Sequence, residues 1–180
     1  MKSNIATAAF LLLCILMFGF GMNSCSGVYS RDRFAYTSRD FDAHVEGRID
    51  GDEVAIKIQN RPSATESEYN LILSFTSPTA LGGLTLSRCG NGRCEARLGE
   101  LILQDFKAEG LLKPFLSLIY SGEIASVSID EDKATVISVK TDEYDLIYCF
   151  PDGYEYPQSI IGKVGDRKIE LLIKSFECAP

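Results

Sequence analysis

The sequence predicts a mainly β domain of the α+β class, built from one antiparallel sheet of about ten short strands and a single helix. Apolar and polar residues alternate with period two in short runs between Phe41 and Phe176, as they do in strands with one buried face. Turn signals such as Asp50-Gly51 and Asn91-Gly92 separate these runs and favour hairpins. Only one stretch has helical spacing. A sheet of this size is expected to curl or close, because large flat sheets are unusual.

The first 24 residues have the build of a secretory signal peptide. Lys2 provides a positive start, residues 5–20 form an apolar run without a charge, and small polar residues follow. The tetrapeptide Met-Asn-Ser-Cys that ends at Cys25 resembles a bacterial lipobox, which implies a lipid on Cys25. Simple cleavage and retention as an uncleaved anchor are the alternatives. All three place the remaining chain outside the cytosol, either lipid-anchored on the outer face of the cell membrane or secreted.

Composition limits what the exported part can be. Removing residues 1–24 from the 180 leaves 156, the size of one domain. The formal net charge of −7 becomes −8 without Lys2, which argues against a nucleic-acid or anionic-membrane partner. The sequence has one His and no phosphate loop, metal-ligand cluster or nucleophile elbow. We therefore expect no cofactor, no metal and no enzymatic activity.

Residues 25–40 lack both helical and strand periodicity and are predicted to form a tether that precedes the domain at 41–180. Docking of Phe34 and Tyr36 on that domain is the alternative.

The first hairpin has a well-specified register. A type I′ turn at Asp50-Gly51 gives one apolar and one polar face. The apolar pairs are Gly47 with Val54, Val45 with Ile56 and Ala43 with Ile58, and the polar pairs are Arg48 with Glu53 and His44 with Lys57. A slip of one residue would mix the two faces. His44 is thus expected to be an exposed strand residue rather than a catalytic base.

A second hairpin is predicted in the segment Cys89-Gly-Asn-Gly-Arg-Cys94. A two-residue turn at Asn91-Gly92 makes Cys89 and Cys94 a directly opposed pair about 4.5 Å apart at Cα, within the span of a disulfide. A redox or metal site is the other interpretation, but the segment lacks CxxC spacing and a nearby His. We expect a disulfide that staples this hairpin.

One helix is predicted over residues 112–119. Its apolar stripe has i, i+3, i+4, i+7 spacing and consists of Leu112, Phe115, Leu116 and Ile119. Pro114 suits the first helical turn, and Gly122 suits the position just past the end. The helix is too short to cross a membrane, so it is expected to pack on the sheet as core or as a lid over an apolar cavity.

The other predicted strands span residues 69–75, 84–89, about 100–106, 124–129, 134–140, 144–150, 154–164 and 168–176. Regular hairpins among the last of these place Cys149 and Cys178 at the same end of the sheet, about 9.6 Å apart across one strand. That exceeds the roughly 7 Å that a disulfide spans. Pairing requires the C-terminal tail to fold across the edge, and an intermolecular bond through Cys178 is the alternative.

The chain resembles the LolA/LolB-like lipoprotein carrier superfamily, and within it small Gram-positive lipoproteins that include the clostridial germination lipoproteins. The resemblance covers roughly residues 41–176. It depends on the order of elements, the late helix, and the motifs Phe75-x-x-Pro78-x-x-Leu81-x-Gly83, Gly153-x-x-x-Pro157-x-x-Ile160, Lys168-Ile169-Glu170 and Phe176. It implies a strongly curved antiparallel sheet, an open half-barrel whose concave face is covered by helix over an apolar cavity. Carriers of this family hold acyl chains there, and the germination relatives support a cell-wall amidase.

Two functions follow from this resemblance. The first is a membrane-tethered module that binds a lipid or other apolar ligand in a cavity. The residues expected to line it are Leu71, Leu73, Phe75, Leu112, Phe115, Leu116 and Ile119. The second is an interaction protein without a ligand, whose edge strand or acidic face binds an envelope protein partner such as a cell-envelope or spore cell-wall enzyme.

Overall fold

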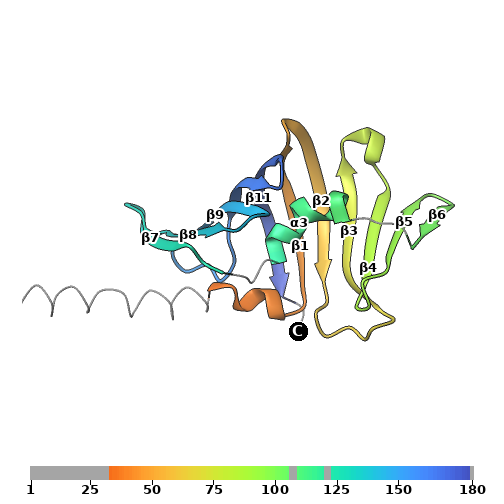
Figure 1. Ribbon diagram of the computed structural model, residues 1–180, viewed down its shortest axis with the longest axis horizontal. Helices are drawn as coiled ribbons and strands as arrows, with labels where there is room; N and C mark the ends of the chain where they lie inside the picture. The colour runs from red at the N-terminus through yellow and green to blue at the C-terminus, as the bar shows by residue number, and fades with distance from the viewer. Residues whose placement is uncertain (1–32, 106–108, 120–122, 179–180) are drawn as a thin grey trace, which may run out of the picture. The chain divides into compact units, whose positions relative to one another are not determined.

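In the part of the chain that the structure describes, eleven strands form one antiparallel sheet that is not closed (Figure 1). The computed structural model describes residues 33–105, 109–119 and 123–178. The strands are β1 (Phe41–Ile49), β2 (Asp52–Asn60), β3 (Tyr69–Ser77), β4 (Leu84–Cys89), β5 (Cys94–Leu98), β6 (Leu101–Gln104), β7 (Ser126–Ile129), β8 (Thr135–Lys140), β9 (Tyr144–Phe150), β10 (Ser159–Val164) and β11 (Arg167–Cys178). The helical segments are η1 (Ala35–Ser38), η2 (Thr79–Leu81), α3 (Glu109–Leu116) and η3 (Ser117–Ile119). The prediction of a mainly β domain with little helix is confirmed.

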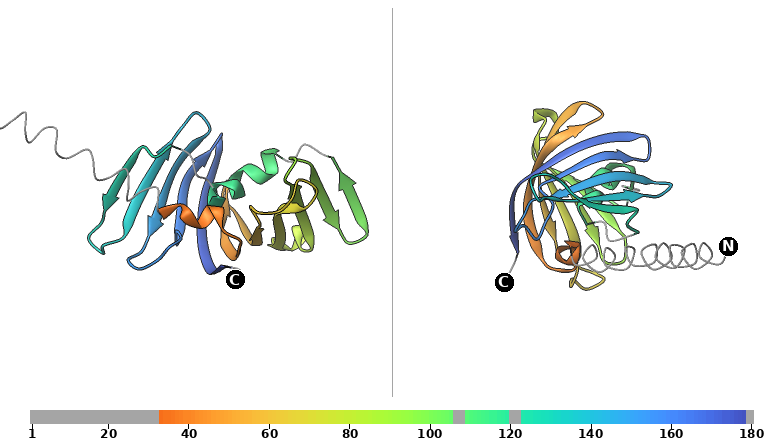
Figure 2. Two further views of the ribbon diagram at one scale, coloured as in Figure 1. Left: turned by 90° about the horizontal axis from the view of Figure 1, so that it is seen from below. Right: turned by 90° about the vertical axis from the view of Figure 1, so that its left-hand side faces the viewer.

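The first and last strands meet in the middle of the sheet. The strand order is β6-β5-β4-β3-β2-β1-β11-β10-β9-β8-β7, so each half is a simple meander and β6 and β7 form the two edges. Ten strand spacings separate those edges, about 48 Å measured along the sheet. The segment between β6 and β7 must therefore cross one face, and α3 lies on its path within the curve of the sheet (Figure 2).

Two glycines and three bulges bend the strands. Bulges interrupt the pairing at His44/Val45, Ala55/Ile56 and Tyr69/Leu71, and bulges increase local bend and twist. A Cβ on Gly47 would lie 2.0 Å from the Glu170 carbonyl oxygen, and one on Gly162 would lie 2.0 Å from that of Asp145. Glycine at these two positions lets neighbouring backbones approach closely enough for the sheet to curve.

The inner face of the sheet, on the side of α3, carries the hydrophobic core. Alternate residues of every long strand are buried there, among them Val45, Ile56, Leu73, Leu146 and Ile169. The register predicted for the first hairpin is confirmed in all five of its named pairs. Asp50 and Gly51 have φ of 55° and 94°, as a type I′ turn requires.

The helix begins earlier than its apolar stripe predicts. Because α3 starts at Glu109, Pro114 lies inside it rather than in the first turn. Pro114 cannot donate a backbone hydrogen bond, and the chain tightens into η3 immediately afterwards, where the Ser117 hydroxyl donates to the Pro114 carbonyl at 2.5 Å. Gly122 lies outside the described residues. Among the helices that are described, none is long and apolar enough to cross a membrane.

Several predicted strands differ in extent from the observed ones. The strand expected over 154–164 is confined to β10, because residues 151–158 form turns that begin with the Tyr154 N–H donating to the Pro151 carbonyl at 3.1 Å. The last strand is longer than expected and runs to Cys178, since all of β1 pairs with residues 169–178 of β11.

Candidate functional site

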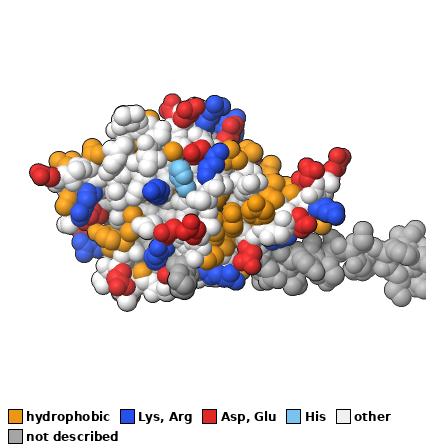
Figure 3. All heavy atoms as spheres, turned by 180° about the vertical axis from the view of Figure 1, so that it is seen from behind, with side chains coloured by type: hydrophobic (Ala, Val, Ile, Leu, Met, Phe, Trp, Pro, Cys, Tyr) orange, Lys and Arg blue, Asp and Glu red, His pale blue; other side chains and the backbone are white. Residues whose placement is uncertain are grey.

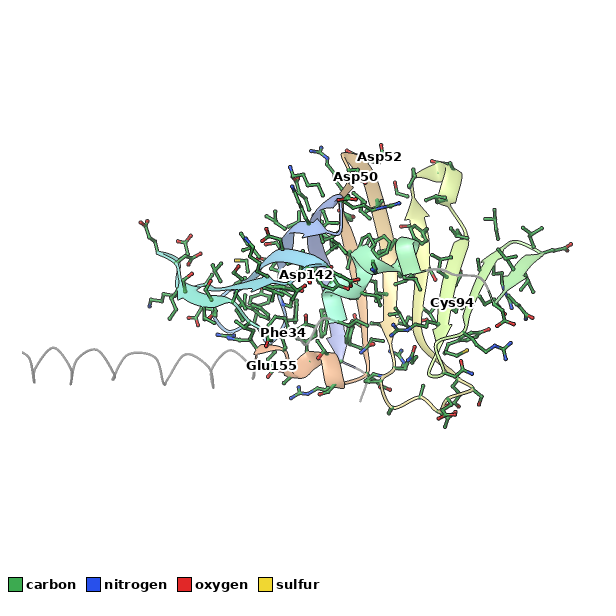
Figure 4. The ribbon with its side chains drawn as sticks, in the orientation of Figure 1. Phe34, Asp50, Asp52, Cys94, Asp142 and Glu155 are labelled. Atoms are coloured by element: carbon green, nitrogen blue, oxygen red, sulfur yellow. The ribbon has the colours of Figure 1, made fainter. Side chains whose placement is uncertain are left out.

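A hollow of about 820 Å³ opens at the end of the inner face where the β1–β2 hairpin faces η2 (Figure 4). We call it the inner hollow. Its apolar lining consists of Ile49, Val54, Phe75, Pro78, Leu81, Leu84, Leu86 and Phe115. Its polar lining consists of Asp50, Asp52, Glu53, Ser77, Thr79 and Arg167. Its volume and its mix of apolar walls with a few polar groups are typical of small-molecule sites.

The helix α3 supplies the floor of the inner hollow. Phe115 packs edge-to-face on Phe75, with ring centroids 5.5 Å apart and an interplanar angle of 84°. Both rings are buried at 2% and 6% exposure. They mark the boundary between the hollow and the closely packed core behind it.

The structure brings all seven predicted cavity residues to the inner face, but most of them belong to packed core. Leu71, Leu73 and Leu112 are buried, and Leu116 and Ile119 are partly buried against the same cluster. Only Phe75 and Phe115 also line the inner hollow.

Ile49, Val54, Leu84 and Leu86 line the hollow and were not among the predicted residues. The register of the first hairpin contains a signal for Val54, since it places Val54 on the apolar face. For Leu84 and Leu86 the sequence contains no signal that they line a hollow, because this depends on how the helix crosses the sheet.

The opposite end of the inner face is filled by the segment that precedes β1, which we call the N-terminal strap (residues 33–40). Phe34 and Tyr36 are buried, so the docking alternative for the predicted tether applies to its described part. The Tyr36 hydroxyl donates to the Leu118 carbonyl at 2.6 Å. Phe34 packs edge-to-face on Tyr148 and Phe150 with centroid distances of 5.0 and 5.7 Å. The strap therefore occupies the end of the inner face that lies away from the inner hollow (Figure 4).

The outer face has a second hollow, of about 720 Å³. It crosses β1, β2, β10 and β11, and its lining combines charged side chains such as Glu46, Arg48 and Glu170 with the exposed apolar side chains of Ile161 and Leu172. Ion pairs neutralise these charges locally, including Arg48 with Glu53 at 3.7 Å and Lys174 with Glu46 at 3.4 Å. His44 lies on this same face opposite Lys57, as predicted, in a smaller depression of about 280 Å³.

The predicted register of the second hairpin is wrong by one residue. Cys94 lies opposite Arg88, and Cys89 lies opposite Tyr69 of β3. The loop contains three residues that end at Gly92, which has a φ of 84° and donates its N–H to the Cys89 carbonyl at 2.9 Å. Cys94 shares a face with Arg88, so Cys89, the next residue along β4, points to the other face.

No disulfide joins any two cysteines within the described ranges. Cys149 lies opposite Ser159, which lies opposite Leu172. Cys178 lies six residues farther along β11, opposite Phe41, and six residues of strand add about 20 Å. A disulfide between Cys149 and Cys178 is incompatible with this separation. Burial also raises the pKa of the Cys149 thiol, which favours its weakly nucleophilic protonated form. Cys25 lies outside the described residues.

The fold and the inner hollow together define a class of protein: an open, curved antiparallel sheet that carries a helix and a partly apolar hollow on its inner face. No family model matches the chain, and no curated protein matches it.

Solved structures of similar fold exist. An uncharacterized conserved protein from Thermus thermophilus is 13% identical and aligns over 85% of this chain and 88% of its own, with a TM-score of 0.56. MucB is 13% identical with a TM-score of 0.53, and the alignment covers 89% of this chain but 60% of MucB. A LolA superfamily protein from Nitrosomonas europaea is 9% identical over 84% of this chain and 93% of its own, with a TM-score of 0.49. At such identities the first two matches show a shared fold and nothing more.

Proposed function

We propose that the chain is a membrane-anchored, non-enzymatic binding module of the LolA-like superfamily, in its Gram-positive lipoprotein branch. It holds a lipid or another apolar ligand in the inner hollow. A lipid on Cys25 anchors it to the outer face of the cell membrane, and the alternative is a secreted protein. The observation that carries this proposal is the inner hollow itself, a space of about 820 Å³ whose apolar lining includes the exposed side chains of Pro78 and Leu81 beside buried core residues. The sequence motifs of the resemblance and the curved, helix-covered sheet that they imply support it as well.

The inner hollow suits a hydrocarbon chain. Each CH₂ group moved from water onto its apolar lining contributes about 0.8 kcal/mol. A buried stretch of about ten carbons therefore supplies about 8 kcal/mol before the entropy of ordering the ligand is subtracted. The proposal contains no chemical step, since His44 faces the other side of the sheet and apolar side chains form the floor of the hollow.

The test is the lipid content of the full-length protein purified from its own host. We expect native mass spectrometry and solvent extraction to find about one bound lipid per chain. Leu84→Trp fills the hollow from β4 and should remove most of that lipid without unfolding the protein. Leu172→Trp, on the outer face, is the matched control and should retain it. Repeated absence of lipid from the wild-type protein would exclude the proposed function.

A second candidate is an interaction protein that supports a cell-envelope or spore cell-wall enzyme. It is favoured by an apolar cluster on the outer face formed by Ile147, Ile161 and Leu172, which are 47–49% exposed (Figure 3). Ile147 and Ile161 are direct cross-strand partners, and Leu172 lies diagonally across from Ile161. Under this function Ile161→Lys lowers cell-wall hydrolysis in the host and Leu84→Trp does not. The opposite pattern assigns the function to the inner hollow.

A further inference from the structure

The rim of the inner hollow carries an uneven set of charges. Among the described residues, three carboxylates line it, from Asp50, Asp52 and Glu53, against the guanidinium of Arg167, which gives these four side chains a net charge of −2. Arg48 approaches Glu53 from the outer face at 3.7 Å through exposed side chains. Counting it leaves the rim at −1. The apolar lining and the acidic rim are thus two separate properties of one site.

Two of these carboxylates, those of Asp50 and Asp52, lie at the open end of the inner face. Asp52, Val54 and Ile56 are alternate residues of β2 and therefore point to the same face. Because Val54 and Ile56 are buried on the inner face, Asp52 lies on that face beside the apolar lining. Asp50 is fixed in the turn, because the Lys168 N–H donates to its carboxylate at 2.9 Å and its own N–H donates to the Lys168 carbonyl at 2.8 Å. The Lys168 ammonium pairs instead with Glu170, at 2.8 Å.

We propose that the inner hollow selects amphiphiles with a cationic head group, whose hydrocarbon lies on the apolar lining while the cation lies at Asp52. This inference rests on the proposed function and names the class of ligand. An anionic fatty acid would place its carboxylate beside a rim of the same sign, which weakens binding, whereas an ammonium gains attraction at the same position. The outer hollow offers no such discrimination, because its charged side chains are paired with opposite charges.

The experiment compares three probes with one twelve-carbon tail: dodecyltrimethylammonium, dodecyl maltoside and dodecanoate. Full-length protein is placed in nanodiscs of phosphatidylcholine, which carry no net charge, with empty nanodiscs as the blank. Bound probe is measured by equilibrium dialysis below each critical micelle concentration. We expect the cationic probe to bind about tenfold more tightly than the anionic one at low salt, with the neutral probe between them. The difference should shrink in 1 M salt, where the Debye length falls to about 3 Å.

Matched variants test whether the charges at the rim cause the preference for the cationic probe. Asp52→Asn should reduce the cationic-to-anionic ratio about threefold, and Arg167→Gln should raise it by a similar factor, because each removes one rim charge of opposite sign. Glu131→Gln removes a carboxylate from the β7–β8 turn, at the far edge of the sheet, and should leave the ratio unchanged. A ratio that responds to Glu131→Gln as strongly as to Asp52→Asn reflects net charge alone and overturns the assignment.

The outcomes separate this inference from the function on which it rests. Equal binding of all three probes above the blank overturns the head-group preference and leaves an apolar-ligand site intact. Tighter binding of dodecanoate also overturns it. Binding of no probe above the blank overturns the proposed function itself.

Discussion

Tyr36 places a phenol in the packed end of the inner face, and its ionisation is linked to folding. Burial raises the pKa of the Tyr36 hydroxyl above its ordinary value of 10.0. Below pH 10 the folded and unfolded chains both keep this proton, so the group adds no pH dependence. Above pH 10 only the unfolded chain releases it, so the free energy of unfolding falls as pH rises, by up to about 1.4 kcal/mol per pH unit.

Tyr36→Phe should therefore be less stable than wild type at pH 8 and lose less stability between pH 10 and 11. The loss at pH 8 is about 1 kcal/mol, because the hydrogen bond to Leu118 disappears. Urea unfolding followed by circular dichroism at each pH measures both effects. Tyr154→Phe, at a residue that is 40% exposed, is the control. Parallel pH profiles for wild type and Tyr36→Phe would contradict the linkage.

Gly47 and Gly51 belong to one hairpin but require glycine for two different physical reasons. An added Cβ at Gly47 meets the Glu170 carbonyl oxygen at 2.0 Å, whereas at Gly51, with φ of +94°, it meets nothing within 4 Å. Gly51→Ala should cost about 1–2 kcal/mol of backbone strain. Gly47→Ala should cost more than about 2 kcal/mol, because β1 and β11 must move apart. Chemical denaturation of the two variants checks the order, and equal losses would show that the strands adjust freely.

At the scale of single elements, β6 is an edge strand, and no other described strand pairs with its outer side. It pairs with β5, and its three apolar side chains Leu101, Ile102 and Leu103 are 72%, 48% and 54% exposed. An exposed apolar edge is a template for pairing with another chain. Sedimentation velocity should show self-association of the wild type that grows with concentration, and Ile102→Lys should suppress it. Ile161→Lys, with the same charge change on an interior strand, is the control. An equal effect of the control would assign the association to the outer face.

The two hairpins show when the sequence alone is sufficient to predict the register of paired strands. Around Asp50-Gly51 the turn chemistry and the alternation of both strands agree on one register, and the prediction is confirmed. Around Asn91-Gly92 the alternation is weak, because polar and small residues occupy both faces near the turn. The same sequence is compatible with a two-residue turn and with a three-residue loop in which Gly92 has a positive φ, and the structure has the longer loop. The cysteine pairing inferred from the shorter turn failed with the register.

The candidate site was less predictable than the fold for a related reason. Periodicity identified the inner-face residues of β3 and of the helix, but which of them face open space depends on where α3 crosses the sheet. The crossing itself follows from the pairing of β1 with β11, which places β6 and β7 at opposite edges and joins residues more than 100 positions apart. Nothing local in either strand encodes that contact. The N-terminal strap posed the same difficulty, since Phe34 and Tyr36 have partners such as Tyr148 and Phe176 far along the chain.

At the scale of the whole domain, the central β1–β11 pair makes the two halves of the sheet interdependent. Separating the halves would expose the inner faces of both strands, including Val45, Ile169 and Leu171, all buried to 1% exposure or less. The N-terminal strap adds a second connection, because Phe34 precedes the first meander yet packs on Tyr148 and Phe150 of the last one. We therefore expect the domain to unfold in a single transition, as small domains commonly do.

Matched core truncations in the two halves test that expectation. Leu73→Ala in β3 and Leu146→Ala in β9 remove side chains of equal size and equal burial, both at 0% exposure. Each should lower the free energy of unfolding by about 2–5 kcal/mol. Each should also move the whole transition together, whether it is followed by circular dichroism or by tyrosine fluorescence. If Leu73→Ala instead produced an early partial transition and left a second one unmoved, β1 and β11 would be a boundary between two folding units rather than the junction that unites them.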